Sequence, residues 1–537
     1  MNRISLLDCT LRDGAYINGS SFGQAAIRGI IKKLQDAGVE IIECGWLKDA
    51  CYTEGSTYYH LPSDMEKYLT DRDKRVTYVA MIDYDRYDDA VLPKCDGRSI
   101  DAIRVVFPRG KADDALVIAK RIRDKGYKVY LQAANTLGYS DKELDELTGA
   151  VNEFRPEALS IVDTFGAMYE DNLTHIVEIL DSRLRDEIGL GFHSHNNQQL
   201  SFALSTHFIK LMEKKNRRII VDSSLSGMGR GAGNTTTELM ASFLNRKYHG
   251  NYDMDSILDA IDMYIGPIRA RYKWGYSTPY FIAGFYQAHV NNIAYLLKNH
   301  RTNARDMRNV IESLSTEERR HYDYDLLEEK YIENQDRQID DEEDKRNIIQ
   351  MIGGRKVILI APGKSVLTEY DRIKRFIEEE KPYVLGVNAI ITDYLPFYDA
   401  VFFTNSIRYS YAKEAYPEEF SKVKRILLSN IKTRSNDELI VNFNLAVKRG
   451  WEHFDNAVIC ALWLLYRLEA EDVYLAGFDG FKASYNESYA DPSLPTLNPG
   501  GKWEELNREI KDMFGDVTES TKNHMNISFL TESVFES

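Results

Sequence analysis

The sequence is poor in cysteine, which bears on both its redox state and its metal chemistry. Its five cysteines, Cys9, Cys44, Cys51, Cys95 and Cys460, are odd in number, scattered and without C-x-x-C spacing. This usage is typical of a reducing cytoplasm and argues against a cysteine-based zinc site. We therefore expect a cytoplasmic protein whose metal ligands come from other residue types.

The chain also lacks a long apolar run and an excess of positive charge. No run approaches the roughly 20 residues of a membrane span, and Met1–Asp8 has the features of neither a signal peptide nor a transit peptide. The formal net charge of −15 makes a general nucleic-acid binder improbable. We predict no membrane span and no nucleic-acid partner.

What is present is a repeated alternation of strand and helix patterns. The 537 residues are 43% hydrophobic, enough for two or three domains with their own cores. Apolar strand-like runs occur at 3–8, 40–45, 76–82, 101–107, 128–134, 158–163, 188–193 and 218–223. Amphipathic helix patterns occur at 23–37, 112–125, 141–154, 172–184, 198–213 and 235–247. Eight such units within residues 1–250 predict an α/β fold, a (β/α)8 TIM barrel, with a doubly wound open sheet as the alternative.

Polar residues suited to metal binding stand at the ends of two predicted strands. His193 and His195 are two residues apart, so a strand turns both imidazoles to the same side. Imidazole suits Zn, Fe, Mn or Co, although two hydrogen-bonded histidines at a strand end would show the same spacing. Asp13 follows the first strand, which neighbours the last one in a closed barrel. We predict that these three residues form one ligand set, with the Arg12 cation beside them to hold an oxyanion.

Three separated segments, 8–14, 191–197 and 227–234, resemble the HMG-CoA-lyase-like, or DRE-TIM metallolyase, superfamily. The segment 162–168 is similar to 4-hydroxy-2-oxovalerate aldolases, and the resemblance covers about residues 3–290. It implies a divalent-metal-dependent aldolase or lyase that acts next to a 2-oxo acid through a pyruvate enolate. It also implies a homo-oligomer, most simply a dimer.

The resemblance assigns roles to particular residues. Asp13, His193, His195 and, as in some members, Asn234 would ligate the metal, for which Mn²⁺ is favoured over Mg²⁺, Co²⁺ and Zn²⁺. Arg12 would stabilise the enolate oxygen, and Thr164, together with backbone amides, would hold the substrate carboxylate. Asn135, at the end of the fifth predicted strand, is a further candidate substrate-binding residue.

One departure from the aldolase pattern concerns the acid or base. The histidine expected just after Arg-Asp-Gly is missing: the sequence continues with Ala15 and Tyr16, and Tyr16 could take over its role. An unperturbed phenol is a weak base at neutral pH, so Tyr16 and Tyr280 are candidate proton-transfer residues whose alternative role is packing at the barrel mouth. The departure leaves two alternatives open: an acyl-CoA-dependent Claisen-type synthase, and a degenerate barrel that serves as a scaffold.

The second half of the chain has a different pattern. Residues 251–345 read as a helical extension and a charged connector, which places a domain boundary near 345. Residues 346–537 contain strand patterns at 356–361, 383–388, 399–404, 424–428 and 472–477, which predict a Rossmann-like α/β domain.

The turn after the first of these strands suggests a ligand. Pro362–Ser365 joins a strand to a helix, an arrangement that suits phosphate binding, but Ile358 stands where a Walker A loop needs glycine. The segments 361–365, 386–388, 402–405 and 474–479 are loosely similar to nucleotide-sugar-associated domains that share their fold with some bacterial sialyltransferases. That resemblance implies a nucleotide or nucleotide sugar near Gly363, Ser365, Asn388, Asn405 and Asp479, and a role in surface-sugar biosynthesis. The alternative is an empty pocket or a role in assembly.

Overall fold

The computed structural model describes residues 4–299, 302–433, 438–496, 498 and 501–536. Its contacts divide the chain into two compact units, one up to Ile293 with Arg319–His321, the other Ala294–Glu318 with the chain from Tyr322 onward. The sequence-based boundaries after residues 250 and 345 stay a prediction. Within the described ranges, no helix combines the length and the hydropathy that a membrane span needs.

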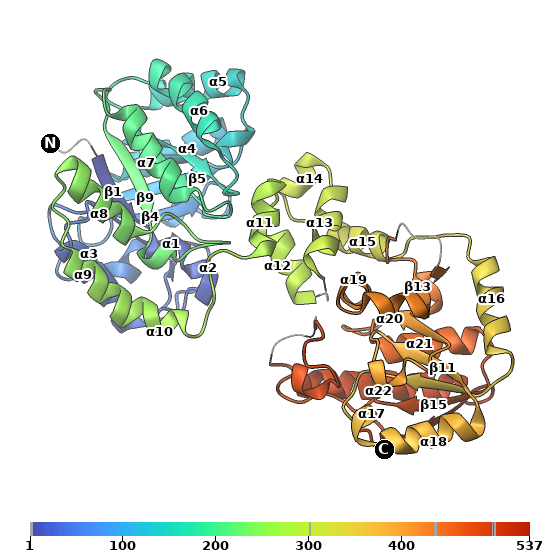
Figure 1. The fold of residues 1–537 in the computed structure, drawn as a ribbon. Coiled ribbons are helices and arrows are strands. Elements are labelled where there is room, and N and C mark those ends of the chain that lie inside the picture. Colours follow the sequence, from blue (N-terminus) through green and yellow to red (C-terminus); the bar gives the residue numbers. More distant parts are fainter. Residues whose placement is uncertain (1–3, 300–301, 434–437, 497, 499–500, 537) are drawn as a thin grey trace. The chain divides into compact units, whose positions relative to one another are not determined.

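The first unit is a closed barrel of parallel strands (Figure 1). Its strands are β1 Ile4–Asp8, β2 Ile41–Leu47, β4 Thr77–Asp83, β5 Ala102–Phe107, β6 Lys128–Ala133, β7 Ala158–Asp163, β8 Gly189–Ser194 and β9 Ile219–Ser223. Neighbours pair in the order β1-β9-β8-β7-β6-β5-β4-β2, and β1 pairs with β2 through Leu7 and Ile41, which closes the ring. The predicted TIM barrel is confirmed, and closure excludes the open-sheet alternative. A short strand that was not predicted, β3 Tyr58–Tyr59, pairs in parallel with the end of β2.

Helices follow most of the strands, as the sequence pattern predicts. They are α1 Thr10–Asp13, α2 Ala15–Asn18, α3 Gln24–Asp36, α4 Ala112–Asp124, α5 Asp141–Phe154, α6 Glu170–Arg183, α7 Ser201–Met212, α8 Thr237–Tyr248, α9 Met254–Ala260, α10 Gly266–Arg269, α11 Thr278–Phe285 and α12 Val290–Asn299. Local sequence fixes where they begin. Ser140 and Glu143, for example, form a capping box that starts α5.

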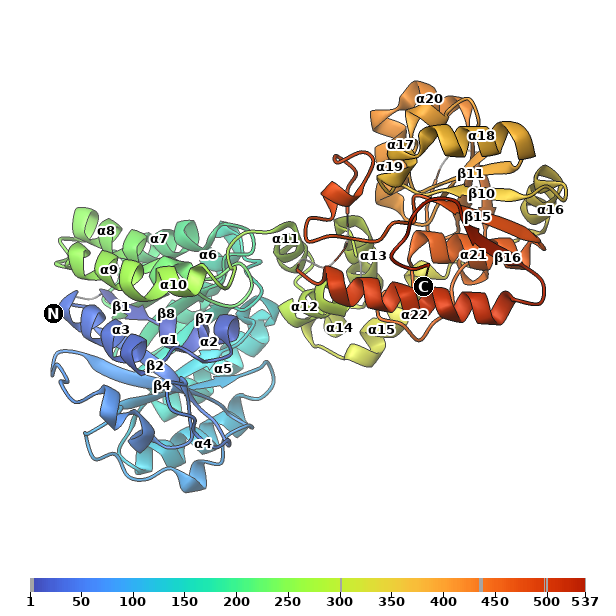
Figure 2. The same cartoon turned by 90° about the horizontal axis from the view of Figure 1, so that it is seen from below.

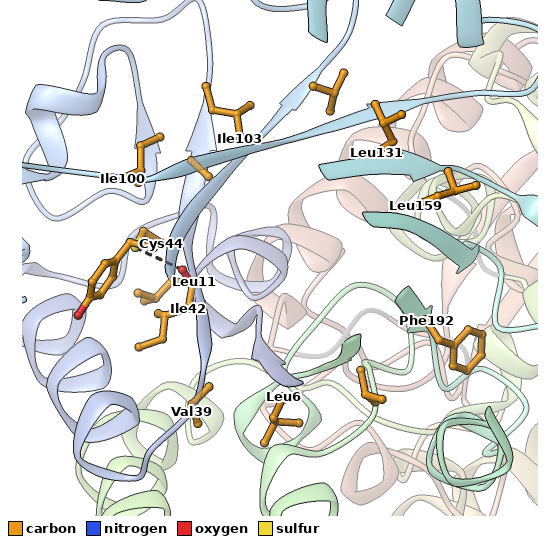
Figure 3. Packing of buried hydrophobic residues seen from close by; sticks show 14 of the residues in the cluster. Leu6, Leu11, Val39, Ile42, Cys44, Ile100, Ile103, Leu131, Leu159 and Phe192 are labelled. Atoms are coloured by element: carbon orange, nitrogen blue, oxygen red, sulfur yellow. Dashed lines mark hydrogen bonds between the residues drawn. The ribbon is translucent and has the colours of Figure 1, made fainter. Parts of the chain in front are cut away.

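Strand alternation sorts the barrel residues into two sets. One set packs outward beneath the helices and includes Leu6, Ile42, Ile103, Leu131, Leu159 and Phe192, each from a different strand (Figure 3). The other set fills the interior, where Leu7, Ile41, Ala102, Tyr130, Ala158 and Ile220 form an apolar cluster.

The next layer of side chains inside the barrel, toward the carboxyl ends of the strands, is charged. Ile41, Ala102 and Ile220 are followed at i+2 by Glu43, Arg104 and Asp222, all fully buried. Because residues i and i+2 face the same side of a strand, these charges form the next layer inside the barrel. His193 belongs to this side of β8, so the charged layer lies directly beneath the predicted site.

Asp8, the last residue of β1, is hydrogen-bonded to helix α8, and its pKa is raised. Its buried carboxylate accepts hydrogen bonds from the Thr10 amide at 2.9 Å and the Thr237 hydroxyl at 2.6 Å. Burial raises the pKa of Asp8 to about 6, because these hydrogen bonds only partly offset desolvation. The folded barrel therefore holds this proton more tightly than the unfolded chain does. The stability that this protonated carboxyl gives is lost as pH rises from its unfolded pKa of 3.8 through about 6.

The variant Asp8→Asn is expected to reveal this penalty, because it removes the charge at nearly constant size. Its stability relative to the wild type should rise by about 1 kcal/mol between about pH 5 and pH 7, and then level off. Differential scanning calorimetry of the full-length protein across this range measures the gap. The control is Asp124→Asn, the same substitution at an exposed aspartate of the same unit. A gap for Asp8→Asn that stays constant with pH would contradict the assignment.

The second unit is built on a separate parallel sheet with helices on both faces (Figure 2). Its strands are β10 Val357–Ile360, β11 Tyr383–Val387, β12 Ala400–Phe403, β13 Lys424–Leu428, β14 Glu438–Val441, β15 Asp472–Ala476 and β16 Asn526–Phe529, paired in the order β14-β13-β12-β11-β10-β15-β16. Its helices are α13 Ala304–Ser313, α14 Thr316–Arg320, α15 Tyr324–Gln335, α16 Glu342–Ile352, α17 Ser365–Thr368, α18 Tyr370–Glu380, α19 Ser406–Ala415, α20 Pro417–Lys422, α21 Ala457–Arg467 and α22 Trp503–Thr521.

The two faces of this sheet have separate cores. Helices α16, α21 and α22 cover one face, and α18, α19 and α20 cover the other. The five strands predicted in this half are present, whereas β14 and β16 were not predicted. The α/β class of this half is confirmed.

Candidate metal centre

Asp13, His193 and His195 converge at the carboxyl ends of the barrel strands. One ligand atom from each lies within 4.8 Å of the others, and all three side chains are buried. The two imidazole rings are 5.0 Å apart at an interplanar angle of 87°. His193 lies in β8 and His195 follows the last residue of that strand, and the short helix α1 that follows β1 supplies the aspartate. The structure thus brings together the three residues that the sequence analysis grouped.

Asp13 is held in its ionised form by its neighbours. Its Oδ1 accepts a hydrogen bond from Arg12 Nη1 at 2.7 Å, and its Oδ2 accepts one from Asn234 Nδ2 at 2.5 Å. Burial alone would raise the pKa of Asp13, but Arg12, the two histidines and Asn234 together hold it well below the usual range. The carboxylate is therefore available as a ligand at neutral pH.

The two histidines are suited to bind a metal for different reasons. His193 Nδ1 lies 2.9 Å from Asp222 Oδ2, which leaves Nε2 for a metal, the pairing that a ligating histidine commonly makes. Burial lowers the pKa of His195 to about 3, with His193, Arg12 and Arg230 acting in the same direction and Asp13 opposing them. Neutral imidazole is the form that binds a metal.

One buried ionic network joins both sides of this cluster. Arg104 donates hydrogen bonds to Asp222 and, at 3.0 Å, to Glu43, whose Oε2 also accepts from Arg12 Nε at 2.7 Å. Arg12 in turn bonds Asp13. The chain of contacts therefore runs from His193 through Asp222, Arg104, Glu43 and Arg12 to Asp13.

The composition of this network fits a bound cation. It contains two arginines and three carboxylates, which leaves one uncompensated negative charge in a buried place. Asn234 Oδ1 is also buried there, and no donor among the described residues reaches it. Two imidazoles, a carboxylate and an amide oxygen are a donor set for a divalent transition metal, so the residues present fit the predicted ion. The identity of the metal stays a prediction.

Gly229 shows how closely the glycine-rich loop approaches the cluster. A Cβ on this residue would lie 2.4 Å from Asn234 Nδ2 and 2.7 Å from Asp13 Oδ2. Any side chain would displace one of these two groups. The loop therefore needs glycine at this position to bring Asn234 against Asp13.

Arg12 and Tyr16 lie beside the cluster with different degrees of constraint. Arg12 is 4% exposed, and its guanidinium lies 5.8 Å from the centre of the Trp46 ring. Tyr16 meets the same tryptophan edge-on at 6.1 Å, and Arg230 lies 4.9 Å above the tyrosine ring. Part of the ring is exposed, but desolvation raises the pKa of the Tyr16 hydroxyl above its usual value, an effect that Asp13 reinforces and Arg230 opposes.

The remaining predicted residues of the barrel fall into two cases. Thr164 and Asn135, at the ends of β7 and β6, are joined by a hydrogen bond of 2.7 Å from the Asn135 amide to the Thr164 hydroxyl oxygen. The hydroxyl hydrogen of Thr164 is left to donate elsewhere. Tyr280 lies half-buried on α11, and in the described part of the chain it has no hydrogen bond to the metal cluster.

Several residues of this site were not singled out from the sequence. Arg104 and Asp222 belong to the buried network, and both interrupt apolar strand runs, a signal that could have identified them. His289 directly precedes α12, and its Nε2 lies 2.9 Å from Arg230 Nη2. No spacing in the sequence connects His289 to the barrel strands.

The five residues predicted to bind a nucleotide lie in the second unit. Gly363, Asn388, Asn405 and Asp479 follow β10, β11, β12 and β15, and all four line one cavity there. Ser365 begins the short helix α17 and bonds Asp479.

Comparison with known proteins gives matches for the first unit. The HMGL-like family model matches residues 109–263. The chain is 27% identical over 266 residues to 4-hydroxy-2-oxovalerate aldolase of Thermomicrobium roseum, covering 49% of this chain and 72% of that one. It is 25% identical over 262 residues to oxaloacetate decarboxylase of Mycobacterium tuberculosis, covering 48% and 74%.

Among solved structures, a match is the N-terminal domain of a suggested aldolase from Bacteroides vulgatus. It has 23% identity and a TM-score of 0.47, and covers 54% of this chain and 95% of that chain. The predicted superfamily resemblance of the first unit is confirmed by the family-model match and the related sequences.

Proposed function

We propose, from the premise that the barrel belongs to the HMGL-like (DRE-TIM metallolyase) superfamily, that it is a divalent-metal-dependent carbon–carbon lyase. Its substrate would be a 2-oxo acid, and the bond that it forms or cleaves would be the one that leaves a pyruvate enolate. The observation that carries this proposal is the buried cluster of Asp13, His193 and His195 with Arg12 beside it. Relatives named as an aldolase and a decarboxylase support the reaction class. Mn²⁺ is the metal to test first.

Arg12 is the residue placed to stabilise the enolate. A divalent cation in this site would supply Lewis acidity toward the substrate carbonyl. Arg12 uses Nε and Nη1 on Glu43 and Asp13, and its Nη2 has no hydrogen bond within the described part of the chain. That nitrogen can donate to an oxyanion as negative charge develops, and the two carboxylates fix its direction beforehand. The Thr164 hydroxyl would donate to the substrate carboxylate from the neighbouring strand end.

Tyr16 is better suited to donate a proton than to remove one. Desolvation raises its pKa, so the phenol keeps its proton throughout the neutral range. We therefore assign Tyr16 as a proton donor at the mouth of the barrel. Burial also raises the pKa of Tyr280, which makes it a second candidate donor.

Deuterium exchange into the methyl group of pyruvate, followed by NMR, tests the proposal. We expect exchange with Mn²⁺ and without CoA, and none after treatment with a chelator. Exchange that persists in the metal-free protein would contradict the assignment of the ligands. Exchange that requires an acyl-CoA would instead support the Claisen-type alternative.

The variant Arg12→Lys is expected to slow this exchange roughly tenfold to hundredfold, because lysine keeps the charge but loses the planar fork of donors. Metal content should not change, since lysine keeps the positive charge beside Asp13 and all the proposed ligands remain. The control is Arg185→Lys, at an exposed arginine of the same unit. Equal exchange rates for Arg12→Lys and the wild type would remove Arg12 from the proposed chemistry.

A further inference from the structure

The second unit has a cavity at the place where its strand order reverses. The chain builds the sheet outward from β10 through β11 to β14, and then returns to the other side of β10 with β15. In open α/β sheets, ligands bind at the carboxyl ends of the strands beside such a reversal. A cavity with an empty volume of about 840 Å³, part of it open to solvent, lies there and is lined by residues that follow β10, β11, β12 and β15.

The turn that the sequence suggested for phosphate is occupied by the chain itself. Asp479 Oδ2 accepts a hydrogen bond from the Ser365 amide at 2.8 Å, and Oδ1 accepts one from the Ser365 hydroxyl at 2.5 Å. A Cβ on Gly363 would lie 2.6 Å from the same carboxylate. This turn therefore already holds an anionic group.

Two other predicted residues have their polar atoms engaged within the sheet. Asn388 is in a left-handed conformation with φ of 54°, and its side chain bonds both the amide and the hydroxyl of Thr404. Asn405 caps α19 by accepting from the Arg408 amide at 3.0 Å. They shape the cavity but leave the recognition of a charged ligand to another residue.

That residue is Arg408, which the sequence analysis did not single out. It lies in the first turn of α19, lines the cavity and is 7% exposed. Its Nη1 is buried without a hydrogen-bond partner among the described residues, and its guanidinium lies 4.8 Å from the centre of the Tyr489 ring. Burial lowers the pKa of Arg408. Tyr489, which hydrogen-bonds the side chain, and the Asp491 carboxylate act in the opposite direction but do not fully offset that effect.

A buried arginine with a structural role, Arg217, has all its contacts within the protein, unlike Arg408. Arg217, 2% exposed, donates to the Asp181 carboxylate and to four backbone carbonyls. A buried arginine nitrogen without a partner is costly, so Arg408 Nη1 is suited to contact an anion in the cavity. The N-terminus of α19 adds favourable backbone dipoles at the same position.

The rest of the lining narrows the class of ligand. The rings of Phe478 and Phe481 contribute apolar surface, and the Asp479 carboxylate has lone pairs left to accept hydrogen bonds from hydroxyl groups. A ligand that contacts Arg408, the Asp479 carboxylate and the phenylalanine rings has an anionic end, hydroxyl groups and a planar apolar part. We propose that this cavity binds a nucleoside phosphate, with its phosphate on Arg408 and the first turn of α19.

Isothermal titration of the full-length protein with AMP, GMP, CMP, UMP and UDP tests this proposal, with the parent nucleosides and inorganic phosphate as further probes. We expect at least one nucleotide to bind, more tightly than both its own nucleoside and phosphate. Arg408→Gln should weaken that binding by about 10- to 100-fold, the value of one or two charge-assisted hydrogen bonds. The absence of binding by every nucleotide at millimolar concentration would overturn the proposal, as would a nucleoside that binds as tightly as its phosphate.

Two further variants separate binding from folding. Arg375→Gln, at an exposed arginine of the same unit, should leave nucleotide affinity unchanged. Unliganded Arg408→Gln should melt at or above the wild-type temperature, since the change removes a buried charge that has an unsatisfied nitrogen. Lower melting with unchanged nucleotide affinity would show that Arg408 has a structural role, and would overturn the proposal. These outcomes are independent of the barrel chemistry, which pyruvate exchange reports.

Discussion

Replacing His195 by alanine is expected to abolish metal binding and to reduce pyruvate exchange by roughly 1000-fold or more. His195 is one of only three grouped ligands in the described chain, and its imidazole is kept neutral in a buried site. Asp13, His193 and the Asn234 amide oxygen are too few ligands to hold the ion against dialysis. Metal analysis of the dialysed protein measures the first effect, and NMR exchange measures the second. The metal readout does not depend on which 2-oxo acid is the true substrate.

A matched control is available on the barrel exterior. His175 is exposed and bonds Asp141 at 2.8 Å, away from the cluster. His175→Ala should retain both the metal and the exchange. If His195→Ala keeps a full complement of metal, the three-residue site is wrong, whatever happens to activity.

The barrel could be predicted because its strands are long apolar runs separated by amphipathic helices. The ends of each predicted strand lie within about two residues of those of an observed strand. Strands that are buried on both faces are nearly continuous apolar runs, so their ends are visible in the sequence. The grouping of Asp13 with His193 and His195 followed from one periodicity and from the closure of the barrel. The strand period of two aligned the histidines, and ring closure placed the first loop beside them.

The charged interior could not be predicted in the same way. Glu43, Arg104 and Asp222 are far apart in sequence, and their contact depends on which residues face inward at one height of the barrel. Arg12 and Asp13 were recognisable as a pair, but the link from Arg12 through Glu43 to Arg104 requires the register of three strands.

The second unit shows a different limit. β14 and β16 have only four residues each, and β16 is half-exposed, so neither forms a long apolar run. They are strands because the neighbouring strands offer unpaired edges. Arg408 was missed for a related reason. A single arginine in a helical turn has no sequence signature, and only burial without a partner distinguishes it.

Replacing Arg104 by methionine is expected to destabilise the barrel by about 3–5 kcal/mol, the usual cost of removing one partner from a buried ionic group. Arg104 is 1% exposed and bonds Glu43, Gln132 and Asp222. Burial alone lowers the pKa of Arg104, but Asp222 and Glu43 reverse this effect and raise it. Without the guanidinium, two carboxylates stay buried with too little positive charge. Urea denaturation of the metal-free protein measures the loss.

The same variant separates a structural role from a positioning role. Asp222 orients His193, so loss of Arg104 should also weaken Mn²⁺ affinity, by about 10- to 100-fold. The double variant Arg104→Met with Asp222→Asn should recover part of the stability, because it removes one uncompensated charge, but not the metal affinity. Arg98→Met, at an exposed arginine paired with Asp96, is the control and should leave both quantities unchanged. If Arg104→Met unfolds like the wild type and binds Mn²⁺ equally well, the network contributes neither to the fold nor to the metal site.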